Sequence, residues 1–122
     1  MTGGKAGIMK DSIKYALEGI GEGWRNHPNF RRQMVILAAV LAAGWRYRIS
    51  GSEWIAVILA SGLVMGAEMA NTAIEAAVDL ATLEKRPKAK IAKDAAAGGV
   101  MIMSVAAAIV GIIIFLPRLM GH

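Results

Sequence analysis

The residues best suited to chemistry lie in one apolar stretch, residues 66–80, which carries three carboxylates and one amide. These side chains recur at helical spacing: Glu68, Asn71, Glu75 and Asp79. At about 100° per residue they fall within an arc of roughly 80° on one helix face. The fourteen residues 54–67 carry no charge and lead directly into the first acid. Because acids at the end of an apolar segment are costly in a bilayer, we expect a membrane protein that keeps them to use them.

The depth of these acids follows from helix geometry. Glu68 lies fourteen residues beyond Trp54, which is about 21 Å along a helix. In an apolar core about 30 Å thick, this places the carboxylate in one leaflet, just below the headgroups. Glu75 and Asp79 lie about two and three turns further on, beside a basic segment. One acid is therefore expected at the depth of a lipid hydroxyl, and two at the wet surface.

This arrangement suits a proton-accepting carboxylate held below a place where metal and phosphate bind. Acids along a membrane helix also suit ion or proton conduction, and hydrogen bonding between helices of an oligomer is a purely structural alternative. The sequence has no Gly-x-x-x-x-Gly-Lys-Ser/Thr loop and no protein-kinase catalytic loop. The residues alone thus leave an enzyme, a small pore-like or holin-like oligomer and a scaffold subunit open.

The composition indicates a small all-α membrane protein. Of the 122 residues, 56% are hydrophobic, above the roughly 45–50% of soluble domains. The absence of Cys excludes thiol chemistry, and two distant histidines argue against a His-based metal cluster. On so apolar a chain, the net charge of +5 is more typical of the cytoplasmic side of a membrane than of nucleic-acid binding. We therefore expect no nucleic-acid partner.

A single membrane domain covering residues 1–122 is expected, and its first part, residues 1–27, is expected to lie in the membrane interface. Apolar side chains recur there at i, i+4, i+7, i+8 and i+11, starting at Met9. This periodicity is typical of an interfacial amphipathic helix, although a surface helix of a soluble bundle shows the same pattern. Three glycines are expected to weaken the helix after about Ile20, and Pro28 marks its boundary.

Three membrane-spanning helices are expected to follow, at residues 28–49, 53–83 and 91–118. The first has only twelve consecutive apolar residues, so its flanking arginines would have to snorkel. Ser52 is the expected N-cap of the second. The third carries no charge over 23 residues, and the small residues at its start predict close packing in an oligomer.

The distribution of basic residues predicts the orientation. The N-terminal part and the 82–93 connection hold eleven Lys and Arg, whereas the loop between the first two spans and the C-terminal tail together hold three. Because cytoplasmic loops carry the excess of Lys and Arg, we expect the N-terminus and the acids in the cytoplasm and the C-terminus outside.

We call Glu68, Asn71, Glu75 and Asp79 the acid line. Along it, the sequence resembles the prokaryotic diacylglycerol kinase family of small integral membrane lipid kinases. Residues 68–79 read Glu-Met-Ala-Asn-Thr-Ala-Ile-Glu-Ala-Ala-Val-Asp, which is similar to the family signature. Residues 92–94, Ala-Lys-Asp, and 29–31, Asn-Phe-Arg, agree in order and spacing. The resemblance covers nearly the whole chain, and a Glu-x-x-Asn-x-x-x-Glu-x-x-x-Asp pattern on a membrane helix is a specific signal.

The resemblance implies a multi-pass homotrimer in the bacterial cytoplasmic membrane, with sites between subunits at the cytoplasmic face. It implies ATP as co-substrate, Mg²⁺ as cofactor and a membrane lipid alcohol as the phosphate acceptor. The family name points to diacylglycerol, with phosphatidic acid as the product. The sequence around the motifs is also similar to that of the branch that includes undecaprenol kinases, which make undecaprenyl phosphate.

Roles for the acid line follow from the resemblance. Glu68 resembles the general base that takes the proton of the lipid hydroxyl, and Asn71 would help to position the base or the substrate. Glu75 resembles a metal ligand beside the nucleotide, and Asp79 a supporting acid there. Phosphoryl transfer needs positioning and charge neutralisation more than covalent help, which suits these residue types.

Further site residues lie outside the acid line. Lys93 and Asp94 resemble nucleotide contacts, with Lys93 near the phosphates, and Tyr15 aligns with an aromatic residue near the nucleotide. The family places a metal-binding Glu where this chain has His27, and Mg²⁺ disfavours imidazole. We therefore keep His27 as a candidate nucleotide contact and Glu22 as the candidate replacement ligand.

Overall fold

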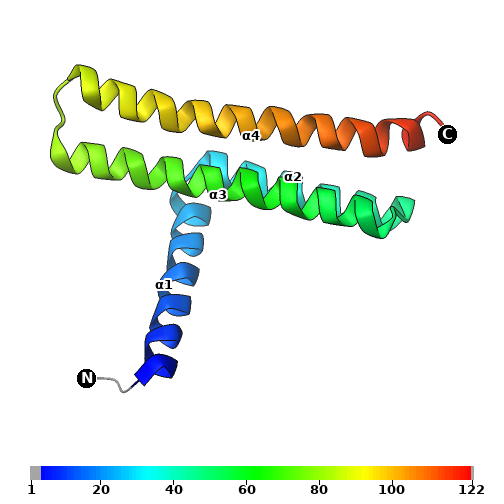
Figure 1. Cartoon of the computed structure of the whole chain (residues 1–122), viewed down its shortest axis with the longest axis horizontal. Helices are drawn as coiled ribbons and strands as arrows, with labels where there is room; N and C mark the ends of the chain where they lie inside the picture. Colours follow the sequence, from blue (N-terminus) through cyan, green and yellow to red (C-terminus); the bar gives the residue numbers. More distant parts are fainter. Residues whose placement is uncertain (1–3, 122) are drawn as a thin grey trace.

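The computed structural model describes residues 4–121, and within them the chain is helical apart from short connections (Figure 1). The helices are α1 (Gly4–Asn26), α2 (Pro28–Tyr47), α3 (Gly51–Ala81) and α4 (Pro87–Leu119). This confirms the all-helical class and the four helical segments expected from the apolar periodicity.

Helices α3 and α4 form a long antiparallel hairpin, and α2 packs along α3 (Figure 1). Helix α1 points away from this bundle, from a place partway along α3 (Figure 1). The connections at residues 48–50 and 82–86 are short, and each joins two antiparallel helices. The hairpin is the element that carries the acid line.

Two of the helices, α3 with 31 residues and α4 with 33, are long and apolar enough to cross a membrane. Few of their side chains are buried inside the chain, so most of their apolar surface is free to meet lipid or another subunit. Helix α2 begins at the expected Pro28, but its shorter apolar run does not meet the same criterion of length and hydropathy.

The boundary between α1 and α2 lies where the sequence predicts it. His27 is extended, with φ −122° and ψ 97°, and Pro28 occupies the first turn of α2. The three glycines do not end the helix early, because α1 continues to Asn26. Packing explains the difference: a Cβ added at Gly23 would lie 3.0 Å from the ring of Phe30, so this glycine allows α1 and α2 to approach closely.

The N-cap of α3 is Ser50, so the expectation of Ser52 is wrong. Ser50 Oγ accepts from the Glu53 amide at 3.2 Å, and the Ser50 amide donates to Glu53 Oε1 at 2.9 Å. This reciprocal pair is a capping box, which requires an acid three residues after the cap. Ser50 has that acid and Ser52 does not.

Helix α4 begins at Pro87, four residues before the expected start of the third span at Ile91. Proline has no amide hydrogen, but the first turn of a helix leaves its amides unpaired in any case. Pro87 therefore starts α4, whereas α3 has already ended at Ala81.

We call the end of the hairpin near the α2–α3 connection the paired end. Its core is the buried cluster of Ile49, Val57 and Ile114. Arg118 Nη2 lies 2.7 Å from Glu53 Oε1, and its Nη1 donates to Glu53 Oε2 at 2.9 Å. This pair joins α3 to α4 between residues 65 positions apart, so the paired end is closed by both apolar packing and a bidentate ion pair.

Candidate active site

The acid line continues the buried face of α3. Val57 and Val64 are buried on this helix, and Glu68 follows Val64 by one turn. Asn71 and Glu75 follow at spacings of three and four, which keeps them on the same side of the helix. One face of α3 thus changes from apolar to acidic along its length, and we call the half of the hairpin beyond Glu68 the acidic end.

Glu68 is the one buried charged residue within residues 4–121, with 8% of its surface exposed. It forms no hydrogen bond or ion pair with any other side chain in that part of the protein. An unpaired buried carboxylate is strongly unfavourable. The Glu68 oxygens are not among the fully buried atoms without a partner, so this carboxylate, at the head of the acid line, is a candidate to meet a group from outside the single chain.

Asn71 lies between Glu68 and Glu75, and only one of the two polar atoms of its side chain has a hydrogen-bond partner. Its Nδ2 donates to Glu75 Oε1 at 3.1 Å. Its Oδ1 is buried and has no partner among residues 4–121. Buried carbonyl oxygens nearly always accept a hydrogen bond, so this atom is available to an arriving donor such as a hydroxyl.

Lys93 and Asp79 are brought together across the hairpin. Lys93 Nζ donates to Asp79 Oδ1 at 2.6 Å, and both side chains are roughly half exposed. Asp94 instead pairs with Lys90 on its own helix. The structure thus places one candidate nucleotide residue of α4 against the acid line and turns the other toward its own helix.

The candidate residues of α1 and the residue that follows it form a separate group. Asn26 Nδ2 donates to Glu22 Oε2 at 2.6 Å, and His27 Nε2 lies 3.6 Å from Glu22 Oε1. Tyr15 is largely exposed. In the described part of the chain, no hydrogen bond or ion pair joins Glu22, His27 or Tyr15 to the acids of α3.

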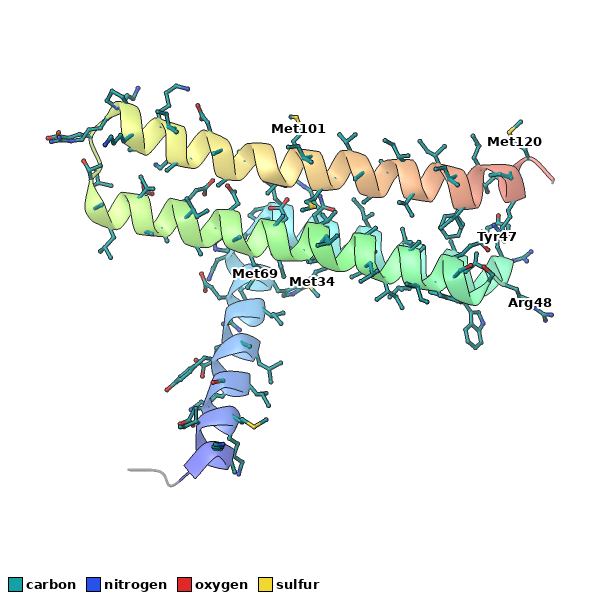
Figure 2. All side chains as sticks on the ribbon, in the orientation of Figure 1. Met34, Tyr47, Arg48, Met69, Met101 and Met120 are labelled. Carbon is teal, nitrogen blue, oxygen red and sulfur yellow. The ribbon has the colours of Figure 1, made fainter. Side chains whose placement is uncertain are left out.

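The α1 group nevertheless lies close to the depth of Glu68. A Cβ added at Gly19 would lie 3.6 Å from Met69 Cε, and Figure 2 shows Met69 where α1 meets the bundle. From Gly51 to Met69, α3 rises about 27 Å, close to the roughly 30 Å of a bilayer core. An interfacial α1 would therefore put Glu68 at the membrane surface and the acidic end beyond it.

The donor set suits magnesium only in part. Within residues 4–121, no group of three His, Asp or Glu side chains is placed to hold a metal ion. Mg²⁺ binds oxygen, keeps several waters and commonly uses one or two carboxylates together with substrate phosphates. Glu75 meets this requirement, and Glu22 supplies a second carboxylate on α1.

Sequence reasoning missed the ion pair at the paired end. It treated Glu53 as the start of a span and Arg118 as part of a tail, although the two now hold α3 and α4 together. Two signals were present: the Ser50-x-x-Glu53 capping pattern, and opposite charges at the matching ends of two antiparallel helices.

Fold and site together define a small helical membrane protein whose unsatisfied polar groups gather at one end of a hairpin. The family model described as prokaryotic diacylglycerol kinase matches residues 14–115. The chain belongs to this family. This family consists of membrane-associated lipid kinases, as the resemblance implied. Membership of the family does not favour the pore-like alternative.

Three relatives illustrate the family. The chain is 43% identical over 108 residues to an undecaprenol kinase of Bacillus subtilis (strain 168), covering 88% of each protein. It is 37% identical over 111 residues to a diacylglycerol kinase of Synechocystis sp., covering 90% of this chain and 63% of that protein. It is 29% identical over 93 residues to a diacylglycerol kinase of Pseudomonas aeruginosa, covering 75% of this chain and 76% of that protein.

Proposed function

We propose that the protein transfers the γ-phosphate of ATP to the hydroxyl of a membrane lipid alcohol, with undecaprenol as the substrate and undecaprenyl phosphate as the product. The observation that carries the proposal is Glu68, a buried and unpaired carboxylate at the head of the acid line. The undecaprenol kinase that shares 43% identity with the chain supports the choice of lipid.

Diacylglycerol is the second candidate substrate, with phosphatidic acid as the product. The sequence analysis placed it first because of the family name, and two relatives are themselves named diacylglycerol kinases. Their identities of 37% and 29% are lower than that of the undecaprenol kinase, so we place this lipid second.

In the proposed reaction, Glu68 accepts the proton of the lipid hydroxyl. The hydroxyl oxygen forms a bond to the γ-phosphorus, the bond from that phosphorus to the β-bridging oxygen breaks, and ADP leaves. Asn71 holds the hydroxyl through its free Oδ1 while its amide nitrogen fixes Glu75. The burial of Glu68 supports this role because it keeps water away from the transferred phosphoryl group.

The nucleotide is proposed to bind at the acidic end. Lys93 leaves Asp79 to meet the phosphates or bridges the two, while Asp94, Tyr15 and His27 line the remainder. Glu75, with Glu22, would hold Mg²⁺. When bound, that ion neutralises phosphate charge.

The proposed assembly is a homotrimer in the bacterial cytoplasmic membrane, with three spans per chain and a cytoplasmic N-terminus. The close packing of α2 along α3 supports a third span. On α3 and α4, a Cβ added at Gly62, Gly66, Gly98 or Gly99 would meet no atom within 4 Å, which leaves room for other helices. Sites between subunits would bring the α1 group of one chain to the acid line of another.

A lipid panel tests the proposed function. Purified protein in detergent receives ATP labelled at the γ-phosphate, Mg²⁺, and undecaprenol or dioleoylglycerol in parallel reactions. We expect labelled lipid phosphate from undecaprenol, with a smaller amount from dioleoylglycerol. Labelling of neither lipid, with ion flux through reconstituted liposomes in the absence of ATP, would overturn the proposal in favour of a pore.

A further inference from the structure

An apolar groove of about 350 Å³ runs between α2, α3 and α4. Val57, Ser61 and Val64 form its wall on α3, and Ser104, Ala107 and Gly111 form its wall on α4. The α4 wall is made of small side chains, and a Cβ added at Gly111 would meet no atom within 4 Å. The groove is therefore open because α4 carries small residues where it faces the other two helices.

The groove leads to Glu68. Its α3 wall lies on the helix face that continues into the acid line, and Glu68 follows Val64 by one turn. From Val57 to Met65, the two ends of this wall, α3 rises about 12 Å. The groove thus ends about one helical turn from the proposed general base and extends from there toward the middle of the bilayer.

Resting on the proposed function, we infer that this groove holds the hydrocarbon chain next to the reacting hydroxyl, and that it selects a lipid alcohol with a single chain. A polyprenol carries its hydroxyl at the end of one chain. A chain lying in the groove therefore brings that hydroxyl to Glu68. Diacylglycerol divides into two chains within a few atoms of its hydroxyl, and the groove admits one.

The size of the groove argues against a helix as its occupant. An α-helix with side chains is about 10–12 Å across, too wide for a cavity of about 350 Å³ that extends over about 12 Å of α3. A second copy of the chain could cover the groove without filling it. The lining carries no charged residue, and its polar side chains are Gln33, Ser61 and Ser104. A serine hydroxyl can bond to the carbonyl one turn before it, so this lining suits hydrocarbon.

The test is the dependence of activity on chain length. Geraniol, with ten carbons, ends short of Gly111, whereas farnesol, with fifteen, extends further along the groove. We expect kcat/KM of the wild-type protein to rise from geraniol to farnesol. In Gly111→Leu, the ratio of kcat/KM for farnesol to that for geraniol is expected to fall roughly tenfold, the discrimination that one or two methylenes give in an apolar pocket.

The matched control is Ala106→Leu, which adds bulk to an exposed position of the same helix outside the groove. It is expected to leave the farnesol-to-geraniol ratio unchanged. If kcat/KM of Gly111→Leu fell by the same factor for farnesol and geraniol, or changed for neither, the inference would be overturned. A wild-type preference for dioleoylglycerol that Gly111→Leu reduces would also overturn it, because the groove would then take an acyl chain.

A second measurement decides the matter even where Gly111→Leu does not fold. A farnesol analogue with a diazirine near its far end is photolysed with the wild-type protein, and the labelled peptide is identified by mass spectrometry. Labelling within residues 33–40, 57–65 or 104–111, the three walls of the groove, supports the inference, and labelling confined to segments outside these walls overturns it. A wild-type protein that phosphorylates no alcohol would refute the proposed function itself, whereas the photolabel reports on the groove alone.

Discussion

The two ends of the α3–α4 hairpin carry the same kinds of side chain and use them in opposite ways. At the paired end, both oxygens of Glu53 bind Arg118 beside a buried apolar cluster. At the acidic end, Lys93 and Asp79 form one partly exposed contact, Glu68 is buried without a partner, and Asn71 Oδ1 accepts nothing within the described chain.

This difference separates stability from function. Satisfied polar groups hold helices together, whereas buried polar groups left unsatisfied destabilise a fold and persist where they meet a ligand. We therefore infer that the paired end holds α4 against α3, and the proposed function places the chemistry at the acidic end. Substitutions that are chemically alike should have different consequences at the two ends.

The largest contrast is expected between two acid-to-amide substitutions. Glu68→Gln keeps the shape but cannot accept a proton, so kcat for lipid phosphorylation is expected to fall roughly 10²- to 10⁴-fold. Glu53→Gln removes a charge at the other end and is expected to keep most of the activity. Circular dichroism and gel filtration check that both variants stay folded; a fully active Glu68→Gln would exclude Glu68 as the base.

The next contrast compares two basic residues of α4. Lys93→Met is expected to raise the KM for ATP roughly tenfold, because a hydrogen bond to a charged group contributes about 1.5–3 kcal/mol, and to leave thermal stability nearly unchanged. Arg118→Met is expected to lower thermal stability and to leave the KM for ATP nearly unchanged. Steady-state kinetics with varied ATP and thermal melts measure both, and an unchanged KM in Lys93→Met would remove that residue from the nucleotide site.

A double-mutant cycle sharpens the description of the paired end. Glu53→Gln and Arg118→Met are each expected to lower the midpoint of thermal unfolding by several degrees, and the double variant by less than the sum, because the two side chains share one interaction. Additive effects would show that the ion pair contributes little to holding the helices.

The smallest effect is expected at the helix cap. Ser50→Ala removes the hydroxyl that accepts from the Glu53 amide, and loss of an N-cap typically costs about 1 kcal/mol of stability. Ser52→Ala serves as the control: its hydroxyl lies 3.2 Å from Ser50 Oγ but accepts from no amide of the helix, so a smaller loss is expected. Thermal melts in detergent compare the two; an equal loss in both variants would mean that the capping box is not the stabilising feature.

Much of the helical framework could be predicted from the sequence because the signals are local. Periodicity placed the first helix, apolar runs placed the other three, and His27-Pro28 marked a boundary that the structure confirms. The common face of Glu68, Asn71 and Glu75 followed from spacing alone. The assignment of roles to these residues came from the resemblance, and it stays a prediction.

The features that were missed depend on contacts between distant residues. The glycines of α1 weaken an isolated helix, yet Gly23 is stabilised by close packing on Phe30. The pairing of Glu53 with Arg118 requires the register of α4 on α3, which a 3.6-residue period does not supply. The groove likewise exists only because small residues of α4 face α2 and α3.

The account depends most on the acidic end opening to the cytosol, where ATP is. The chain has no Cys, so single cysteines report cleanly on the two connections. Ser52→Cys lies at the paired end, and Leu83→Cys lies in the exposed α3–α4 connection. We predict that a membrane-impermeant maleimide labels position 52 in intact spheroplasts and position 83 only after permeabilisation. Labelling of position 83 in intact spheroplasts would place the acids outside and contradict the account.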